Sequence, residues 1–579
     1  MNDTDKGAFD QDVLELKKPD RISGSDILLR TLLLEGVECV FGYPGGAVLY
    51  IYDAMHGNDK FRHVLTRHEQ GAIHAADGYA RSTGKTGVCI ATSGPGATNL
   101  VTGIATAYMD SVPLVVITGN VATTLIGTDS FQEADIVGIT QPITKHSSVV
   151  RRAEDLARTL REAFYIAGTG RKGPVLVDIP KDVSAEPADF VYPEHVAVKG
   201  YEPYPLIDQS ELDALAAALE AAERPLLLAG GGVVQADASA ELCRFAERQG
   251  IPVVTTLLGL GGFPSGHELW FGMPGMHGSY AANQALLQCD LLLSVGARFD
   301  DRVTMKLDGF ARQAVIAHID IDAAEIGKLV PTALPVTGDA KQVLQRLNAI
   351  AAPTSEKRAE WLDRLKQADA QFPLQYKDAE DELKPQYVIE MMSRTTNGEA
   401  FVTTDVGQHQ MWTAQFFRFG KPRSLITSGG LGTMGFGFPA AIGAQIGNPD
   451  SLVISINGDG GMQMCAQELA ICAIRRIPVK IAVINNRTLG MIKQWQELIY
   501  DGRFSHIDLS GSPDFVKLAE AYGVKALRAQ TKREAEEAWQ EALRTPGPVL
   551  IDFVVSQHEL VYPMVPQGMA LSDMLLGEV

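Results

Sequence analysis

One short pattern in the last third of the chain limits the fold more than any other: Gly458-Asp459-Gly460, followed by Asn485-Asn486. The apolar, β-branched run 452–456 leads into the first glycine and predicts a buried parallel strand. A helical pattern follows over 462–476, and the apolar run 479–484 predicts the next strand. That pattern places Met462, Cys465, Leu469, Cys472 and Ile474 on roughly one side of the predicted helix. The stretch is therefore predicted to form a strand–helix–strand crossover between parallel strands.

Two polar side chains end these neighbouring strands, so we expect Asp459 and Asn486 to meet at the carboxyl edge of one sheet. A carboxylate, an amide oxygen and a backbone carbonyl from the next turn, at Thr488, form an oxygen set that suits Mg²⁺. The adjoining glycines let backbone N–H groups approach an anion at the helix N-terminus. The plain alternative is a strand-end turn with a helix-capping aspartate. The Asn485-Asn486 pair at the end of the next strand makes this alternative less favoured.

A second stretch near the N-terminus repeats this organisation. Gly87–Thr92 is predicted as a strand, Ser93-Gly94-Pro95-Gly96 as a glycine turn before a helix, and 114–118 as a strand that ends at Gly119-Asn120. The chain is thus predicted to contain two divergent copies of one α/β unit. The first copy has no aspartate in its glycine turn, so only the second is expected to bind a metal.

Alternating helical and strand patterns predict an α/β protein of three doubly wound parallel-sheet domains. We assign them to residues 1–190, 205–350 and 385–579. Aperiodic tracts, rich in proline and tyrosine or in charge, separate them and are interpreted as linkers. The tail 559–579 is either a lid over a site or a plain surface tail.

Composition excludes several classes of protein. A net charge of −19 argues against a nucleic-acid partner, whose binding surface would be basic. No apolar run reaches membrane-spanning length, and residues 1–18 resemble neither a signal nor a transit peptide. The six cysteines include no CxxC pair, so we interpret them as reduced thiols of a cytoplasmic protein.

Further motifs strengthen the prediction of a cofactor site. Arg67-His68-Glu69-Gln70-Gly71-Ala72 opens a helix, 405–409 follows a strand, and 429–435 is a glycine tract too long for a simple turn. Met276-His277-Gly278 and 296–302, Gly-Ala-Arg-Phe-Asp-Asp-Arg, lie in the middle region. Together with the glycine–aspartate–asparagine pattern, these motifs resemble the acetohydroxyacid synthase (acetolactate synthase) catalytic subunits of the thiamine-diphosphate enzyme family across essentially the whole chain.

The resemblance implies a catalytic role for Glu69. In the family a glutamate at this place hydrogen-bonds the pyrimidine ring of the cofactor and promotes loss of its C2 proton. The plain alternative is an acid that complements the helix dipole. The same acid argues against glyoxylate carboligase, which has an apolar residue there. Gly46 and Gln132 are the other two residues to which the resemblance implies catalytic roles.

The resemblance also implies ligand residues for two cofactors. Beside Glu69, the expected contacts of thiamine diphosphate are Gln408, His409, Met434, Gly460, Gly461 and Met491. Met434 would hold the cofactor in its bent conformation, whereas as an isolated methionine it would be interpreted as core filler. The expected FAD contacts are Arg171, Gly231, His277, Gly296, Arg298, Asp320 and Asp339. FAD marks the biosynthetic branch of the family, in which the flavin undergoes no net redox reaction.

Substrate contacts and reaction follow from the same resemblance. The expected substrate residues are Phe131, Lys181, Met276, Arg302 and Trp495. Core packing is the competing explanation for Trp495, but its position just after the metal loop favours the site. The implied reaction decarboxylates pyruvate and transfers a two-carbon unit to pyruvate or 2-ketobutyrate, the first common step of branched-chain amino acid synthesis. Pyruvate oxidase and 2-keto-acid decarboxylases are the nearest alternatives.

The two copies divide the chemistry between them, because the first contains Glu69 and the second contains Asp459 and Asn486. In the enzymes that this chain resembles, the two copies that face each other at one site come from different subunits. We therefore expect a homodimer or a dimer of dimers, with a small regulatory subunit as a further partner that the resemblance implies. A regulatory nucleotide-binding protein without activity is disfavoured by the presence of Glu69.

Overall fold

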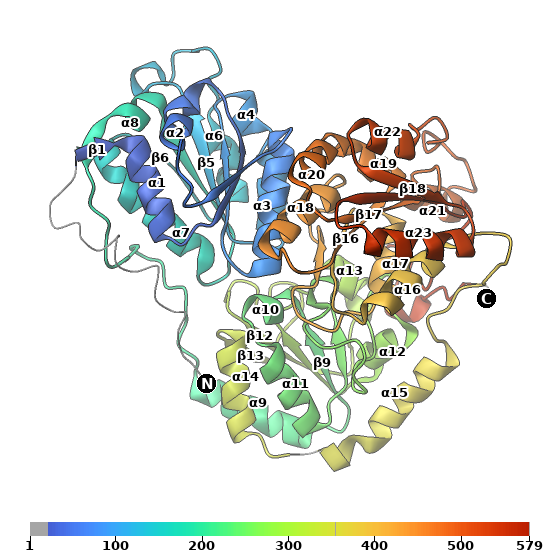
Figure 1. The fold of residues 1–579 in the computed structure, drawn as a ribbon. Coiled ribbons are helices and arrows are strands. Elements are labelled where there is room, and N and C mark those ends of the chain that lie inside the picture. The colour runs from blue at the N-terminus through green and yellow to red at the C-terminus, as the bar shows by residue number, and fades with distance from the viewer. Residues whose placement is uncertain (1–20, 354, 578–579) are drawn as a thin grey trace, which may run out of the picture.

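The computed structural model describes residues 21–353 and 355–577, which form three α/β bodies. In Figure 1 the first lies at the upper left in blue, the last at the upper right in orange and red, and the middle one below them in green. Residues 1–18, which we interpret as neither a signal nor a transit peptide, lie outside the described residues. Within the described residues no helix combines the length and the apolarity needed to cross a bilayer.

The first body is built on a six-stranded sheet of order β3-β2-β4-β5-β7-β6, in which every pairing is parallel. Buried apolar side chains cover both faces of this sheet, as its near-continuous hydrophobic strands require. The strands are β2 (Cys39–Tyr43), β3 (Arg62–Leu65), β4 (Gly87–Ala91), β5 (Leu114–Asn120), β6 (His146–Val149) and β7 (Pro174–Pro180). The main helices are α1 (Gly24–Leu34), α2 (Leu49–Ala54), α3 (Glu69–Thr83), α5 (Val101–Met109) and α7 (Leu156–Gly168).

The last body repeats this topology strand for strand, with order β15-β14-β16-β17-β19-β18 and parallel pairing throughout. Its strands are β14 (Phe401–Thr404), β15 (Leu425–Thr427), β16 (Val453–Gly458), β17 (Lys480–Asn485), β18 (Lys525–Ala529) and β19 (Val549–Val554). Its main helices are α16 (Pro385–Thr396), α17 (Gln408–Phe416), α18 (Gly437–Gly447), α21 (Gly490–Ile499), α22 (Phe515–Ala521) and α23 (Lys532–Arg544). The identical strand order confirms the prediction of two related copies.

A buried asparagine–aspartate pair marks the same place in both copies. Asn120, at the end of β5, donates from Nδ2 to Asp178 on β7, and Asn485, at the end of β17, donates from Nδ2 to Asp552 on β19. Each pair joins two adjacent strands, the fourth and fifth in the order of its sheet, so the asparagine that ends the crossover has a structural partner in both copies.

The middle body has a five-stranded parallel sheet of order β10-β9-β11-β12-β13. Its strands are β9 (Pro225–Ala229), β10 (Val253–Thr255), β11 (Leu291–Val295), β12 (Val315–Asp320) and β13 (Leu334–Thr337). Its main helices are α9 (Gln209–Ala221), α10 (Gly231–Gln235), α11 (Ser239–Gln249), α12 (Tyr280–Gln288) and α14 (Ala340–Ile350), with α15 (Ala359–Gln371) in the tract that follows. Three parallel sheets flanked by helices confirm the predicted fold class.

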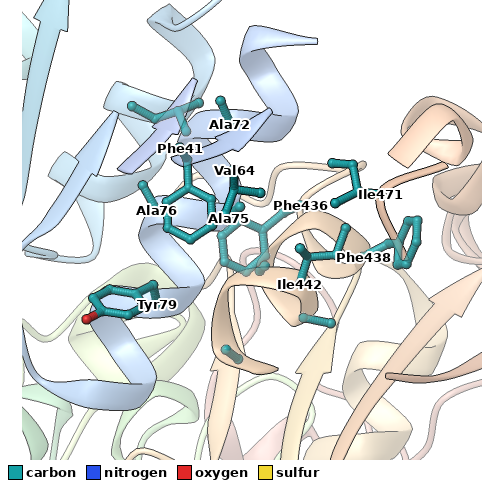
Figure 2. Packing of buried hydrophobic residues seen from close by; sticks show 14 of the residues in the cluster. Phe41, Val64, Ala72, Ala75, Ala76, Tyr79, Phe436, Phe438, Ile442 and Ile471 are labelled. Atoms are coloured by element: carbon teal, nitrogen blue, oxygen red, sulfur yellow. The ribbon is translucent and has the colours of Figure 1, made fainter. Parts of the chain in front are cut away.

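Equivalent helices of the two copies, α3 and α18, pack face to face and join the first body to the last (Figure 2). Their contact is lined by small residues, with Ala72, Ala75 and Ala76 on α3 opposite the α18 segment that holds Ile442. A Cβ on Gly78 would clash with the Ala440 carbonyl, and one on Gly443 with the Ala75 carbonyl. Close approach of the two backbones therefore requires glycine at both positions.

His74 is buried in this contact without a hydrogen-bond partner on either ring nitrogen among the described residues. Its ring packs edge-on against Phe436, and burial lowers its pKa to about 3 from 6.5. The unfolded chain therefore takes up this proton below pH 6.5 while the folded chain does not, so stability falls as the pH drops. Between pH 7 and pH 5 this proton uptake should lower the free energy of unfolding of the wild type by about 2 kcal/mol. His74→Leu should not show that part of the loss. Urea unfolding of both proteins at the two pH values measures this, and equal losses would contradict it.

Two local predictions are wrong. The helix predicted over 462–476 is broken into α19 (Asp459–Met464), a 3₁₀ turn (Ala466–Glu468) and α20 (Leu469–Arg475), because Cys465 leaves helical geometry with φ −133°. Ile474, predicted on the same side as Met462 and Leu469, is 70% exposed, whereas those two residues are buried. At the end of the first predicted domain, β8 (Pro187–Asp189) pairs antiparallel with β1 (Arg21–Ser23).

The tail, residues 559–577, packs against the middle and last bodies. Val561, Met564, Val565 and Leu571 are buried. The Val565 amide donates to the Met276 carbonyl at 2.7 Å, and the Val561 amide donates to Gln494 Oε1 at 2.8 Å. Residues 559–577 therefore pack against both the middle body, through Met276, and the last body, through Gln494.

Candidate functional site

One cavity of about 870 Å³ lies among elements of all three bodies. Most of the residues singled out from the sequence line it: Arg171, Gly231, Met276, His277, Gly296, Arg298, Arg302, Asp320, Asp339, Gln408, His409, Met434, Asp459, Gly460, Gly461, Asn486, Thr488, Met491 and Trp495. Those of the middle and last bodies follow the carboxyl ends of parallel strands, where ligands bind in open α/β sheets.

Asp459 lies at the start of α19, directly after β16, and is 2% exposed. Burial raises the pKa of its carboxyl to about 7, partly offset by the backbone amides of Asp459, Gly460 and Arg487. Its Oδ2 has no hydrogen-bond partner among the described residues. A buried carboxylate oxygen without a partner is costly in a fold, and a cation at this point would remove that cost.

Asn486 completes the donor set from the end of β17. Its Oδ1 accepts the Thr488 amide at 3.2 Å, its Nδ2 lies 3.4 Å from Gln408 Oε1, and Asn486 and Thr488 both line the cavity beside Asp459. The described residues include no group of three His, Cys, Asp or Glu side chains that could hold a metal. One carboxylate with amide and backbone oxygens is the donor chemistry that Mg²⁺ prefers, so the residues present fit that ion.

The glycine tract after β15 is fixed by Asp405, which follows β14. Its carboxylate accepts the Gly435 amide at 3.0 Å and the Val406 amide at 2.7 Å. Burial raises the pKa of Asp405 to about 6. Met434, the neighbour of Gly435, is half-buried, and its methyl would lie 3.5 Å from a Cβ placed on Gly460. The tract therefore presents a methionine to the cavity floor beside the metal loop.

Two cavity-lining histidines have free ring nitrogens among the described residues: His409 Nε2 and His277 Nδ1. Burial lowers the pKa of each ring to about 4, so both are neutral near pH 7. Buried polar atoms normally have partners, so these two nitrogens are suited to a ligand in the cavity.

The far end of the cavity has a close backbone approach after β9 and β11. A Cβ on Gly232 would clash with Gly296, whose φ is +59°, and the Gly230 amide donates to the Val295 carbonyl at 2.9 Å. Arg171 enters this end from the loop before β7 and pairs with Asp322 at 3.0 Å and Glu325 at 2.7 Å. The glycine backbone at this end leaves room for the close approach of a ligand with phosphate groups.

The remaining predicted residues lie elsewhere, at the carboxyl edge of the first sheet. Outside the cavity lining are Gly46, Glu69, Phe131, Gln132 and Lys181. They follow β2, β3, β5 and β7 and share one edge of the first sheet, and none of them lines the cavity that contains Asp459. Phe131 is 87% exposed.

Glu69, half-buried at the start of α3, accepts a hydrogen bond from Asn99 Nδ2 at 2.9 Å. A Cβ on Gly96 would lie 3.4 Å from Glu69 Oε1, so the glycine turn after β4 borders this carboxylate. The sequence showed no role for Asn99 or for the Asp405 carboxylate. Their partners lie 30 positions away in each case, beyond the reach of local patterns.

Comparison with known proteins agrees with this geometry. The N-terminal TPP binding domain of thiamine pyrophosphate enzymes matches residues 22–139, the central domain matches 212–347, and the C-terminal TPP binding domain matches 405–553. The acetolactate synthase large subunit of Corynebacterium glutamicum is 51% identical, over 96% of this chain and 90% of its own length. Isozyme 3 of Escherichia coli K12, also a large subunit, is 46% identical over 96% of this chain and 99% of its own, and a probable large subunit of Methanocaldococcus jannaschii is 49% identical over 96% and 95%.

Each TPP binding profile covers one of the two copies, and the relatives match along nearly the whole chain. The chain therefore belongs to the acetolactate synthase large-subunit family of thiamine pyrophosphate enzymes.

Proposed function

We propose that this chain is a carboligase that decarboxylates pyruvate and transfers the two-carbon unit to pyruvate or 2-ketobutyrate, forming 2-acetolactate or 2-aceto-2-hydroxybutyrate. Bound thiamine diphosphate supplies the carbanion chemistry of this reaction. The observation that supports the proposal best is the unpartnered Asp459 oxygen beside Asn486, in a cavity that also holds Met434. Family membership supports it independently.

In the proposed site Asp459, Asn486 and the Thr488 carbonyl hold Mg²⁺, which neutralises a diphosphate. The other cofactor contacts of the last body are Gln408, His409, Met434, Gly460, Gly461 and Met491, all of which line the cavity. Met434, which lines the cavity, would support the bound cofactor.

Glu69, Gly46 and Gln132 complete the site from a second copy of the chain. This part of the proposal is supported by the absence of these residues from the lining of the cavity in their own chain and by the exposure of Phe131. The assembly is then a homodimer, or a dimer of dimers, with two sites between facing copies. Glu69 would hydrogen-bond the pyrimidine ring and exchange a proton with it.

The proposed substrate residues surround the same opening. Met276 and Trp495 line the cavity, and Arg302 Nη1 lies 3.3 Å from Met276 Sδ. The Arg302 side chain is 57% exposed, so its charge is available to the carboxylate of a 2-keto acid. Phe131 and Lys181 join them from the facing copy.

FAD is proposed for the far end of the cavity, against Gly231, Gly296, Arg298, Asp320 and Asp339, with His277 and Arg171 beside them. We expect the purified protein to be yellow, and its activity to continue without net reduction of the flavin. Visible absorbance of the protein during turnover checks this. A colourless preparation with full activity would contradict it.

The domain limits 1–190, 205–350 and 385–579, the cytoplasmic location and a small regulatory subunit belong to the same proposal. All six cysteines are free thiols, as expected for a reducing compartment.

Product analysis tests the proposed reaction. Incubation with pyruvate, Mg²⁺ and thiamine diphosphate is expected to yield acetolactate, measured as acetoin after acidification, and omission of the cofactor is expected to abolish it. Acetyl phosphate or free acetaldehyde as the main product would overturn the proposal in favour of an oxidase or a decarboxylase.

A further inference from the structure

Glu468 is a buried carboxylate of the last body that contacts the backbone of the first. It is 0% exposed and sits in the 3₁₀ turn that breaks the predicted helix after α19. Both of its carboxylate oxygens accept the Arg67 amide, each at 3.1 Å. Arg67 lies two residues before Glu69, in the turn that leads from β3 into α3.

Two further observations place this carboxylate against the Glu69 turn. A Cβ on Gly71 would clash with Glu468 Oε1, so the first turn of α3 packs directly on it. Burial raises the pKa of Glu468 to about 7, which the Arg67 amide, the Arg67 charge and the His68 amide partly offset. The amides of the turn therefore stabilise the charged form of a group that the fold otherwise buries at a cost.

The position of Glu468 in its own body is also informative. The segment 459–468 has the proposed metal ligand Asp459 at one end and Glu468 at the other. One end of the segment therefore faces the diphosphate half of a site, while the other holds the turn that presents Glu69. The break at Cys465 separates α19 from the turn that contains Glu468.

We propose that Glu468 is a positioning residue for Glu69: by holding the Arg67 amide it fixes the turn from which Glu69 reaches the pyrimidine ring of a cofactor. This inference rests on the proposed function. If sites form between two chains, Glu468 acts on the site that its own Glu69 enters, not on the site that its own Asp459 builds.

The test separates cofactor binding from proton exchange. We expect Glu468→Ala to leave the affinity for thiamine diphosphate with Mg²⁺ unchanged and to slow exchange of the C2 proton of the bound cofactor about 100-fold, the cost of a misplacement of about 1 Å. Glu468→Gln keeps one acceptor oxygen for the Arg67 amide, so it should restore much of the rate. Exchange is followed by quenching in acid after mixing with D₂O, with NMR of the released cofactor.

A double variant shows whether the effect passes through Glu69. Glu69→Gln combined with Glu468→Ala is expected to be no slower than Glu69→Gln alone. Additive losses, equal losses in the Ala and Gln variants, or exchange at the wild-type rate would overturn the inference. Because Glu468→Gln is nearly isosteric, it keeps the test usable should the alanine variant fail to fold. Absence of exchange in the wild type would instead contradict the proposed function.

Arg475→Ala is the matched control. Arg475 ends α20, the helix that directly follows the turn with Glu468. It also contacts the first body, because its Nη2 donates a hydrogen bond to the His63 carbonyl on β3, outside the Glu69 turn. We expect both the affinity and the exchange rate of this variant to equal those of the wild type.

Subunit mixing identifies which site Glu468 serves. A Glu468→Ala chain retains Asp459, and an Asp459→Ala chain retains both Glu69 and Glu468. Exchange of subunits between the two variants is therefore expected to restore one site in each mixed dimer. No gain of activity, under conditions in which Glu69→Gln and Asp459→Ala chains do complement each other, would show that Glu468 acts on its own chain's diphosphate half, and would overturn the assignment.

Discussion

Asp459→Ala is expected to abolish the Mg²⁺-dependent retention of thiamine diphosphate. The buried carboxylate is the only charged donor in the proposed set, and the neutral oxygens of Asn486 and Thr488 cannot offset a diphosphate-bound cation alone. In the wild type, ligand at a hundred times its Kd adds about 2.7 kcal/mol of stability, and the variant should show none of this gain. Thermal unfolding with and without cofactor and Mg²⁺ measures it.

The ligand-free variant provides its own internal check. Asp459 Oδ2 has no partner among the described residues, so removal of the carboxylate should leave the ligand-free fold as stable as the wild type or more so. Asp508→Ala is the matched control, because Asp508 is exposed, accepts the Ser510 amide and lies outside the cavity lining. Retention of the cofactor by Asp459→Ala, equal to that of the Asp508 control, would refute the metal site.

Glu69→Gln is expected to keep the fold and most of the cofactor affinity but to slow C2 proton exchange by about 100-fold or more, the usual range for loss of a positioned acid or base. An amide of the same shape still accepts the Asn99 hydrogen bond, yet it cannot exchange a proton with the pyrimidine ring. Exchange at the C2 carbon is measured directly in D₂O, independently of acetolactate formation.

The control for this prediction is Glu38→Gln in the same body. Glu38 is exposed and pairs with Lys85 at 2.5 Å, away from the glycine turn that borders Glu69. It should exchange at the wild-type rate. If Glu69→Gln did so as well, the acid would serve only the N-terminus of α3.

Part of this site could be predicted from the sequence because its information is local. Asp459 and Asn486 follow two adjacent strands, and parallel strands bring their carboxyl ends to one edge. The same local signals in the first copy predicted a second unit of the same organisation, and the two sheets have the same strand order. Gly231, Arg298 and Arg302 were found only through the family resemblance, because a glycine triplet and a charged turn do not by themselves specify a ligand.

The rest depends on contacts between distant positions. Glu468 and Arg67 are 401 positions apart, and no pattern near either residue announces the other. The helix break at Cys465 was missed because Met462, Cys465, Leu469 and Cys472 are all buried, so the apolar spacing continues across the break. Ile474 shows the converse, an apolar residue left exposed where periodicity predicts burial.

The most direct test of a site shared between two chains is to mix two inactive variants, Glu69→Gln and Asp459→Ala, under conditions that exchange subunits. Random exchange makes half of the dimers mixed, and each mixed dimer pairs one intact Glu69 with one intact Asp459 at one of its two sites. Acetolactate formation is therefore expected to rise from near zero toward about a quarter of the wild-type rate. If activity stayed at the level of the separate variants after exchange was verified, each chain would have to build its own site, and the shared site would be contradicted.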